Sequence, residues 1–285
     1  MIKKLPLFLE KLDVTVFDTE TTGLDPDSGD RIIEIAAVRI KNGVRAGTFH
    51  SLVNPGRPVS PGAFQVNGIS DEMLEGAPAM KEIIPGFVEF IRGSCLCAYN
   101  SPFDMGFLDA EFRRAGKRFP RDTVVVDILA MARGLLRLER HALWYVARSL
   151  GVESEQEHRA LSDVELTLEV FSLLLEAARS KKIATFDEFV GLFGRQCRAV
   201  EAMNNEKLSR LRKAIEKGAA VKIRYFSRSE GAISERRVIP RGMKTGSRNA
   251  GELLNAYCCV NNKERIFRLD GILALRQIPQ RTVAP

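Results

Sequence analysis

The pattern of hydrophobic and polar positions changes its period several times along the first 180 residues. Dense runs of β-branched and aliphatic residues at 14–17 and 31–40, an Asn42-Gly43 turn and a further run at 48–53 predict three strands, the last two forming a hairpin. Farther along, apolar residues recur every three or four positions in some stretches and form short dense runs in others. The elements predicted there are helix 80–92, strand 94–99, helix 103–115, strand 124–127, helix 128–150 and helix 161–178. This order predicts an α/β fold, a mixed sheet with flanking helices.

After about residue 180 the pattern changes. Thr185 and Glu188 have the spacing of a capping box, which predicts a short helix at 186–193, and a second helix is expected at 204–217. Strand-like runs separated by turn residues follow at 221–226, 232–239, 253–260 and 265–269. The domains that we expect are a first domain over 1–180, a helical connector over 181–204 and a small β-rich domain over 205–285.

Composition adds one informative quantity, the distribution of charge. A hydrophobic fraction of 45% and a charged fraction of 28% are ordinary for a globular protein. Residues 1–180 carry 21 Lys+Arg against 26 Asp+Glu, whereas residues 181–285 carry 22 against 10. A basic rear half favours binding of a polyanion, of which nucleic acid is the commonest. Charge alone supports equally well the alternative that the basic surface aids solubility.

Cysteine usage and the lack of long apolar runs bear on the compartment. The five cysteines form neither a metal-binding spacing nor an even-numbered framework, and read as thiols in a reducing compartment; they are Cys95, Cys97, Cys197, Cys258 and Cys259. The apolar run at 5–9 is too short for a signal peptide, and no stretch approaches the roughly 20 apolar residues of a membrane span. A cytoplasmic protein without membrane contact is expected.

Two carboxylates end the first predicted strand. Asp18 and Glu20 follow the apolar run 14–17, and Thr21-Thr22-Gly23 then breaks the strand. Alternate side chains of an extended chain share one face, so the two point the same way, with Cα atoms roughly 6.5 Å apart. Ionised carboxylates beside apolar surroundings are costly unless cations join them, and hard oxygen ligands suit Mg²⁺ or Mn²⁺. A divalent metal site is therefore expected at this strand end.

Two later acids and one histidine belong with this pair. Asp104 closely follows the strand 94–99, and Asp163 stands near the start of a helix, five residues after His158. Taken singly, an Asp near a helix start is more often a capping residue, and a lone His in a polar loop is more often solvated. On one regular helix, five residues turn by about 500°, which would leave His158 and Asp163 about 140° apart. We therefore expect Asp163 in the first helical turn and His158 in the loop before it, where it can move as substrate arrives.

Taken together, the segments FDTETTG (17–23), NSPFD (100–104) and HRALSD (158–163) resemble the three motifs of the DEDDh family of 3′-to-5′ exonucleases. This family includes the proofreading epsilon subunit of bacterial replicative DNA polymerase. The resemblance covers about residues 12–178 and implies the ribonuclease-H-like mixed sheet, in agreement with the order of elements. It also implies hydrolysis of phosphodiester bonds at the 3′ end of DNA or RNA, with two divalent ions, Mg²⁺ or Mn²⁺, as cofactors.

The resemblance implies a role for each residue of the set. Asp18 would bridge both ions, Glu20 and Asp163 would complete the site that activates water, and Asp104 would support the second ion. His158 would be the general base, because histidine exchanges protons near neutral pH.

The basic rear resembles a second family, the WYL domain, a small β-barrel module of bacterial regulators and nucleases. The matching segments lie between residues 213 and 277 and are VKIRY (221–225), ERRVIP (235–240), LNAY (254–257) and RIFRLD (265–270). The naming tripeptide is replaced by ELL (252–254), and Gly271 replaces a usual Arg. The resemblance implies a small barrel-like domain that senses or binds nucleic acid.

Basic and aromatic residues of this domain suit single-stranded nucleic acid, through phosphate contacts and stacking on bases. The binding residues that we predict are Arg237, Arg265 and Arg268. The alternative is that the aromatic residues form the core of the domain, and for Phe267 this alternative is favoured.

The function predicted from the sequence is a metal-dependent 3′-to-5′ exonuclease acting on single-stranded ends, with a rear domain that binds nucleic acid. One alternative is a regulatory nucleic-acid-binding protein in which the exonuclease fold is only a scaffold, and another is a structural partner of a polymerase. The chain has Tyr99 and Asn67 where many polymerase-associated members have histidine, which weakens the assignment to that branch. The sequence does not choose between DNA and RNA and identifies no protein partner.

Overall fold

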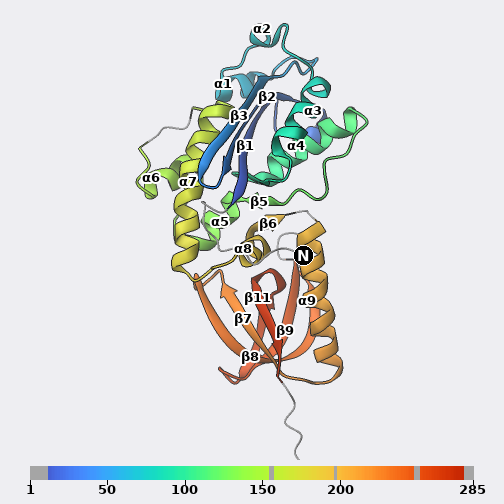
Figure 1. The fold of residues 1–285 in the computed structure, drawn as a ribbon, viewed down its shortest axis with the longest axis vertical. Coiled ribbons are helices and arrows are strands. Elements are labelled where there is room, and N and C mark those ends of the chain that lie inside the picture. The colour runs from blue at the N-terminus through green and yellow to red at the C-terminus, as the bar shows by residue number, and fades with distance from the viewer. Residues whose placement is uncertain (1–11, 154–156, 196–197, 247–250, 279–285) are drawn as a thin grey trace, which may run out of the picture.

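The structure, a computed structural model, describes residues 12–153, 157–195, 198–246 and 251–278. The strands of its first sheet are β1 (Asp13–Thr21), β2 (Ile32–Lys41), β3 (Val44–Leu52), β4 (Cys95–Ala98), β5 (Val125–Asp127) and β6 (Gly194–Arg195). They lie in the order β3-β2-β1-β4-β5-β6 (Figure 1). β2 and β3 are antiparallel neighbours, and β2 is antiparallel to β1; β4 and β5 run parallel to β1, and β6 is antiparallel to β5. The predicted mixed sheet is confirmed, and β1 lies in its interior.

Helices cover both faces of this sheet. They are α1 (Pro61–Asn67), α2 (Asp71–Leu74), α3 (Met80–Ile91), α4 (Ser101–Arg114), α5 (Ile128–Leu135), α6 (Leu143–Ser149) and α7 (Ala160–Ser180), with a 3-10 turn η2 (Pro26–Ser28). On one face, Val14 and Val16 of β1 belong to a buried cluster with residues of α5, α6 and α7. On the other face, Phe17 packs with residues of α3 and α4. The alternating side chains of β1 thus divide the core into two layers.

The prediction of a single helix over 128–150 was wrong, because the chain forms two helices there. Leu136 is extended, and the next helix begins only at Leu143. Leu136 and Leu138 both pack against the same core cluster. Residues two apart point to opposite sides of a helix but share a face in an extended chain, so only an extended segment buries both. The Tyr99 hydroxyl also donates a hydrogen bond to the His141 carbonyl in this segment, at 2.9 Å.

The C-terminal part is a second, antiparallel sheet with a long helix beside it (Figure 1). Its elements are α8 (Phe186–Phe193), α9 (Arg198–Glu216), β7 (Val221–Ser227), β8 (Ala232–Thr245), β9 (Glu252–Cys258), β10 (Lys263–Arg268), the 3-10 turn η3 (Leu269–Gly271) and β11 (Ile272–Gln277). The strand order is β10-β9-β8-β7-β11. Among the described residues β10 and β11 remain unpaired edges, so hydrogen bonds do not close the sheet into a barrel. The sequence pattern missed β11 and placed the start of α9 six residues too late.

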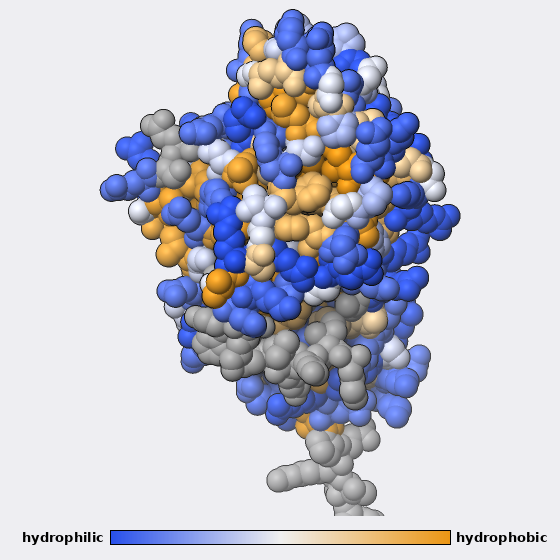
Figure 2. Space-filling view, turned by 45° about the horizontal axis from the view of Figure 1, so that its top comes forward, coloured by the Kyte–Doolittle hydropathy of each residue, from blue (hydrophilic) through white to orange (hydrophobic). Residues whose placement is uncertain are grey.

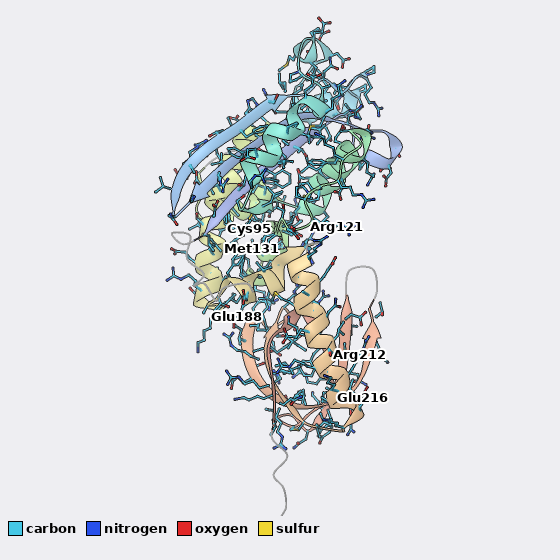
Figure 3. All side chains as sticks on the ribbon, turned by 45° about the vertical axis from the view of Figure 1, so that its right-hand side comes forward. Cys95, Arg121, Met131, Glu188, Arg212 and Glu216 are labelled. Atoms are coloured by element: carbon cyan, nitrogen blue, oxygen red, sulfur yellow. The ribbon has the colours of Figure 1, made fainter. Side chains whose placement is uncertain are left out.

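The two parts of the chain are in direct contact. Phe226 of β7 is fully buried and belongs to the core cluster formed by α5, α7 and α8. Arg224 of β7 makes an ion pair with Glu188 of α8, which lies at the junction in Figure 3. The Lys181 amine donates a hydrogen bond to the Gly231 carbonyl at 3.0 Å. The C-terminal sheet therefore packs on the first part through both apolar and charged contacts.

In Figure 2 hydrophobic surface gathers on the upper part of the molecule, and the visible surface below it is mostly hydrophilic.

Cys95, Cys97 and Cys258 are buried free thiols and Cys259 is partly exposed. Cys197 and the apolar run at 5–9 lie outside the described residues. Across the described ranges, no helix has the length and apolar character needed to cross a membrane.

Candidate active site

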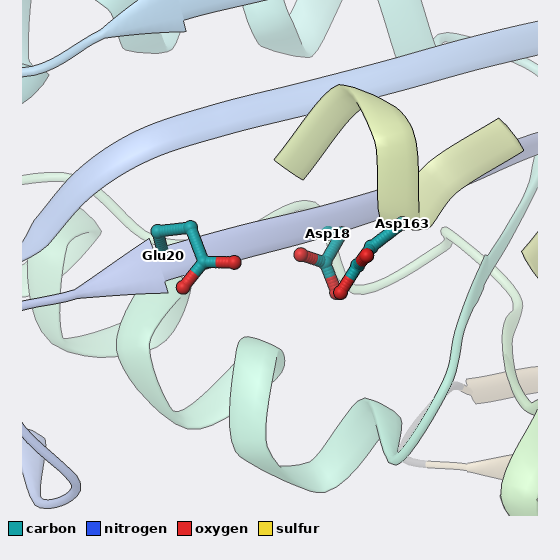
Figure 4. A group of neighbouring side chains, drawn as sticks. All are labelled: Asp18, Glu20 and Asp163. Atoms are coloured by element: carbon teal, nitrogen blue, oxygen red, sulfur yellow. The ribbon is translucent and has the colours of Figure 1, made fainter. Parts of the chain in front are cut away.

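The carboxylates of β1 lie where the strand leaves the apolar core. Asp18 and Glu20 have the same parity as Val14 and Val16, so they point to the face that α7 covers. α7 begins above this strand end, and its first turn carries Asp163. Figure 4 shows Asp18 and Asp163 directed toward one another, with Glu20 farther along the same strand. A strand end and a helix start therefore deliver acids to one place.

The geometry of these three acids suits cation binding. One carboxylate oxygen from each of Asp18, Glu20 and Asp163 lies within 4.8 Å of the others. Asp163 is buried, and Asp18 and Glu20 are partly exposed. Carboxylate oxygens that converge from separate elements are the ligand type that Mg²⁺ and Mn²⁺ take. The donor set therefore fits a divalent cation.

Asp104 approaches from the other face of the sheet. It lies in the first turn of α4, and only 2% of its surface is exposed. Its Oδ1 accepts hydrogen bonds from the Thr19 hydroxyl at 2.8 Å and from the Thr19 backbone N–H at 3.1 Å. Because Thr19 stands between Asp18 and Glu20, these bonds fix Asp104 to the strand that carries the other acids. Asp104 is not part of the group of three that converges within 4.8 Å.

Burial and mutual repulsion make the cluster hold protons in the absence of cations. Burial, and then the nearby Asp104, Glu20 and Asp163, raise the pKa of Asp18 well above its ordinary value. Burial raises the pKa of Glu20 to about 8, with Asp163 and Glu34 adding to it and a hydrogen bond from Asn67 opposing it. Burial also raises the pKa of Asp104 to about 7, against the Thr19 hydrogen bonds. A cation placed among these groups would offset both the burial of the ionised carboxylates and their mutual repulsion.

His158 is exposed and lies in the loop just before α7. Its φ of 52° places it in the left-handed region, which a residue with a Cβ rarely adopts. The structure brings Asp18, Glu20 and Asp163 together with Asp104 beside them, whereas His158 stands outside this group.

The sequence reasoning missed Glu34, a buried acid directly opposite Glu20 on β2. Its carboxylate accepts hydrogen bonds from the Arg159 guanidinium and from the Ala160 backbone N–H, at the start of α7. The available signal was a lone acid in the apolar run IIEIAAV (32–38). A charge in such a run is rarely buried without a partner.

The two positions that depart from the polymerase-associated pattern have defined contacts. Asn67 ends α1 and is buried, and its amide donates a hydrogen bond to the Thr21 carbonyl at 3.4 Å. Its Oδ1 accepts a hydrogen bond from the Ile69 N–H at 3.0 Å. Asn67 therefore fixes α1 to the end of β1, next to Glu20. Tyr99, as described above, bonds to the segment between α5 and α6.

The three arginines predicted to bind nucleic acid do not form one patch. Strand register places Arg237 and Arg265 on opposite faces of the C-terminal sheet. Arg237 is exposed, whereas Arg265 approaches Glu230 at 3.7 Å. Arg268 donates to both oxygens of Asp270, at 3.0 and 2.8 Å. Phe267 is buried in the core of the sheet, as the alternative held.

Comparison with known proteins identifies the family of each part of the chain. Residues 15–171, more than half of the chain, match the Exonuclease family. The chain belongs to the exonuclease family. Residues 206–277 match the WYL domain, so the chain joins an exonuclease domain to a WYL domain. Both resemblances predicted from the motifs are confirmed.

Relatives of the exonuclease domain include polymerase subunits. The DNA polymerase III subunit epsilon-like protein of Rhodobacter capsulatus is 39% identical over 201 residues, which cover 69% of this chain and 28% of that protein. The DNA polymerase III subunit epsilon of Rickettsia prowazekii is 37% identical over 178 residues, which cover 60% of this chain and 78% of that protein. The chain thus spans only a small part of the Rhodobacter relative and most of the Rickettsia one.

Solved exonuclease structures share the fold. The zinc-bound complex of E. coli ExoI with single-stranded DNA has a TM-score of 0.57 at 15% identity, over 94% of this chain and 65% of that chain. The nuclease domain of 3′hExo, a DEDDh family member bound to rAMP, has a TM-score of 0.52 at 17% identity, over 57% of this chain and 92% of that chain. At these identities the likeness concerns the fold alone.

Proposed function

We propose that the chain is a metal-dependent 3′-to-5′ exonuclease that removes nucleotides from single-stranded 3′ ends of DNA or RNA. The observation that carries the proposal is the convergence of Asp18, Glu20 and Asp163 within 4.8 Å, with Asp104 bonded to the same strand. Membership of the exonuclease family and the relationship to epsilon subunits support the direction of cleavage.

Each acid has a place in this proposal. Asp18, as the central acid, would serve both cations, Glu20 and Asp163 would help hold the cation that activates the water, and Asp104 would help hold the second one. When bound, two divalent cations stabilise the attacking and leaving oxygens of an in-line displacement at phosphorus. The four carboxylates supply the negative charge that holds such cations, and Thr19 and Asn67 keep their strand end in place.

His158 is the general base of the proposal. It takes the proton of the attacking water, and its position in an exposed loop allows it to approach as the nucleic acid binds.

Exposed apolar side chains near the strand end suit unpaired bases. Leu24 is 84% exposed and Phe64 is 48% exposed, and their segments are joined where the Ser60 N–H donates to the Thr22 carbonyl. Bases without pairing partners can stack on such surfaces.

The C-terminal domain binds nucleic acid in this proposal. Its excess of basic residues, with 22 Lys+Arg against 10 Asp+Glu in 181–285, supplies the attraction to phosphates. Arg237 is the exposed candidate, whereas Arg268 has to give up its bonds to Asp270 before it can contact phosphate.

The test uses 5′-labelled single-stranded DNA and RNA oligonucleotides with Mg²⁺, Mn²⁺ or EDTA. A descending ladder that needs metal and disappears in Asp18→Asn establishes the activity and its direction, and the faster oligonucleotide identifies the preferred substrate. Glu165→Gln is the matched control, because Glu165 is a partly exposed carboxylate on the same helix as Asp163, paired with Arg45. Nucleic acid bound but not cleaved by the wild type would favour a regulatory binding protein instead.

A further inference from the structure

α7 begins without a cap of its own. The residue before its first turn is Arg159, and its side chain makes no capping hydrogen bond to the helix. The first N–H groups of a helix need acceptors, and a carboxylate is the strongest choice because it also interacts favourably with the helix dipole. Glu34 of β2 provides this acceptor from 126 residues away, since its Oε2 accepts the Ala160 N–H at 3.0 Å.

The same carboxylate also holds the side chain of Arg159. The Arg159 Nε donates to Glu34 Oε2 at 3.1 Å, and its Nη2 donates to Oε1 at 2.8 Å. His50 of β3 lies 2.8 Å from Oε1 through its Nε2. Both oxygens of Glu34 thus have two partners each, which uses the acceptor capacity of a carboxylate. A cation bound by the neighbouring acids would find no free oxygen on Glu34.

We propose that Glu34 is a positioning residue, which fixes the start of α7 to β2 so that Asp163 is held beside Asp18 and Glu20 and the loop residue His158 is anchored next to it in the chain. The inference rests on the proposed function, since it assigns Glu34 a part in that same site. The two residues that Glu34 binds, Arg159 and Ala160, stand between His158 and Asp163 in the chain. The Asp163 N–H donates in turn to the Arg159 carbonyl at 2.9 Å. A shift of this short segment therefore moves both motif residues.

Burial makes the arrangement sensitive to small changes. The Glu34 side chain is 1% exposed and the Arg159 side chain 38% exposed, so the carboxylate is shielded from water while the guanidinium is in partial contact with it. Glu34→Gln keeps the shape of the side chain but places an NH₂ group against donors that need acceptors. The Arg159 fork and the Ala160 N–H cannot all be satisfied by the single remaining oxygen. The substitution therefore weakens the attachment of the start of α7 to β2, and it leaves no cavity because Gln has nearly the same size as Glu.

The test has to separate positioning from general stability, and the chain offers a matched control. Arg39 and Asp13 form a second two-pronged pair between β1 and β2, at 2.9 and 2.8 Å, at the opposite end of the strands. Asp13→Asn therefore removes one carboxylate charge from a similar pair, away from the acids of the site. Three measurements are made on both variants: Mn²⁺ affinity by calorimetry, hydrogen exchange of the first α7 turn, and steady-state kinetics (kcat and KM) on a single-stranded oligonucleotide.

For Glu34→Gln we expect weaker Mn²⁺ binding and lower kcat, each by about 10–100-fold, the usual cost of losing a residue that orients ligands. KM changes little, and amides of residues 160–163 exchange faster. Arg159→Lys, which keeps the charge but loses the fork, lies between wild type and Glu34→Gln. Asp13→Asn keeps wild-type Mn²⁺ affinity and kcat, whatever its stability.

Two results overturn the inference: wild-type Mn²⁺ affinity and kcat in Glu34→Gln, or equal losses in Asp13→Asn. If the wild-type chain cleaves no oligonucleotide, the proposed function fails, and the Mn²⁺ affinities and exchange rates still decide whether Glu34 positions α7.

Discussion

The raised pKa of Glu20 has a consequence for stability that can be measured in metal-free protein. Between its ordinary pKa of 4.5 and its folded-state pKa of about 8, the folded chain binds a proton that the unfolded chain has lost. The unfolded state therefore gains stability relative to the folded state as pH rises through this window. The sign is opposite to that of an acid in a salt bridge, whose folded-state pKa is lowered.

The size of the effect follows from the two pKa values. Each pKa unit corresponds to about 1.4 kcal/mol, so Glu20 lowers the free energy of unfolding by about 5 kcal/mol above pH 8. From pH 5 to pH 7 alone the loss is about 2–3 kcal/mol. Glu20→Gln removes this titrating group. Between pH 5 and pH 7 the unfolding free energy of the variant should therefore fall by about 2–3 kcal/mol less than that of the wild type. The variant becomes more stable than the wild type at neutral pH while losing the ability to cleave.

The assay is urea unfolding in EDTA at several pH values, followed by tryptophan fluorescence. Trp144 is the sole tryptophan and lies in α6, so the signal reports the exonuclease domain. The difference between wild type and Glu20→Gln isolates Glu20 from the other acids, and Glu165→Gln controls for loss of any carboxylate. Parallel pH dependence of wild type and Glu20→Gln would refute the reasoning. Mn²⁺ at pH 8 should restore stability to the wild type and not to the variant.

Three further predictions concern single side chains. Thr19→Val removes the 2.8 Å hydrogen bond to buried Asp104, so it costs about 1–3 kcal/mol of stability and raises the pKa of Asp104 further. Urea unfolding and the pH midpoint of Mn²⁺ binding check it, and an unchanged midpoint contradicts it. His158→Ala keeps Mn²⁺ and oligonucleotide affinity but loses about 10²–10⁴-fold in turnover; the exposed neighbour Glu157→Gln is the control, and near wild-type turnover in His158→Ala refutes the base assignment. Arg237→Ala lowers the slope of log affinity against log salt for single-stranded DNA by about 1. An equal change in Arg212→Ala, at an exposed position of α9, would mean that only net charge matters.

Local sequence patterns were enough to predict the elements that bury one face or both faces. β1, the hairpin of β2 and β3, α3 and α7 lie within a few residues of their predicted ranges. The three acidic motifs also stood out, because charged residues at the ends of apolar runs have few structural explanations. The break between α5 and α6 was not visible in the sequence, because Leu136 and Leu138 fit a helix until the core that they pack against is known.

What the sequence by itself determined about this protein is therefore its family, its α/β order and the acids that converge. Only the tertiary structure decided how these acids are held. The Glu34 carboxylate joins the start of α7 across 125 residues of chain, and Arg237 and Arg265 fall on opposite faces of one sheet through strand register. The physical reason is that periodicity records which side chains are buried, whereas the partner of a buried charge depends on which distant segments the closed fold places beside it.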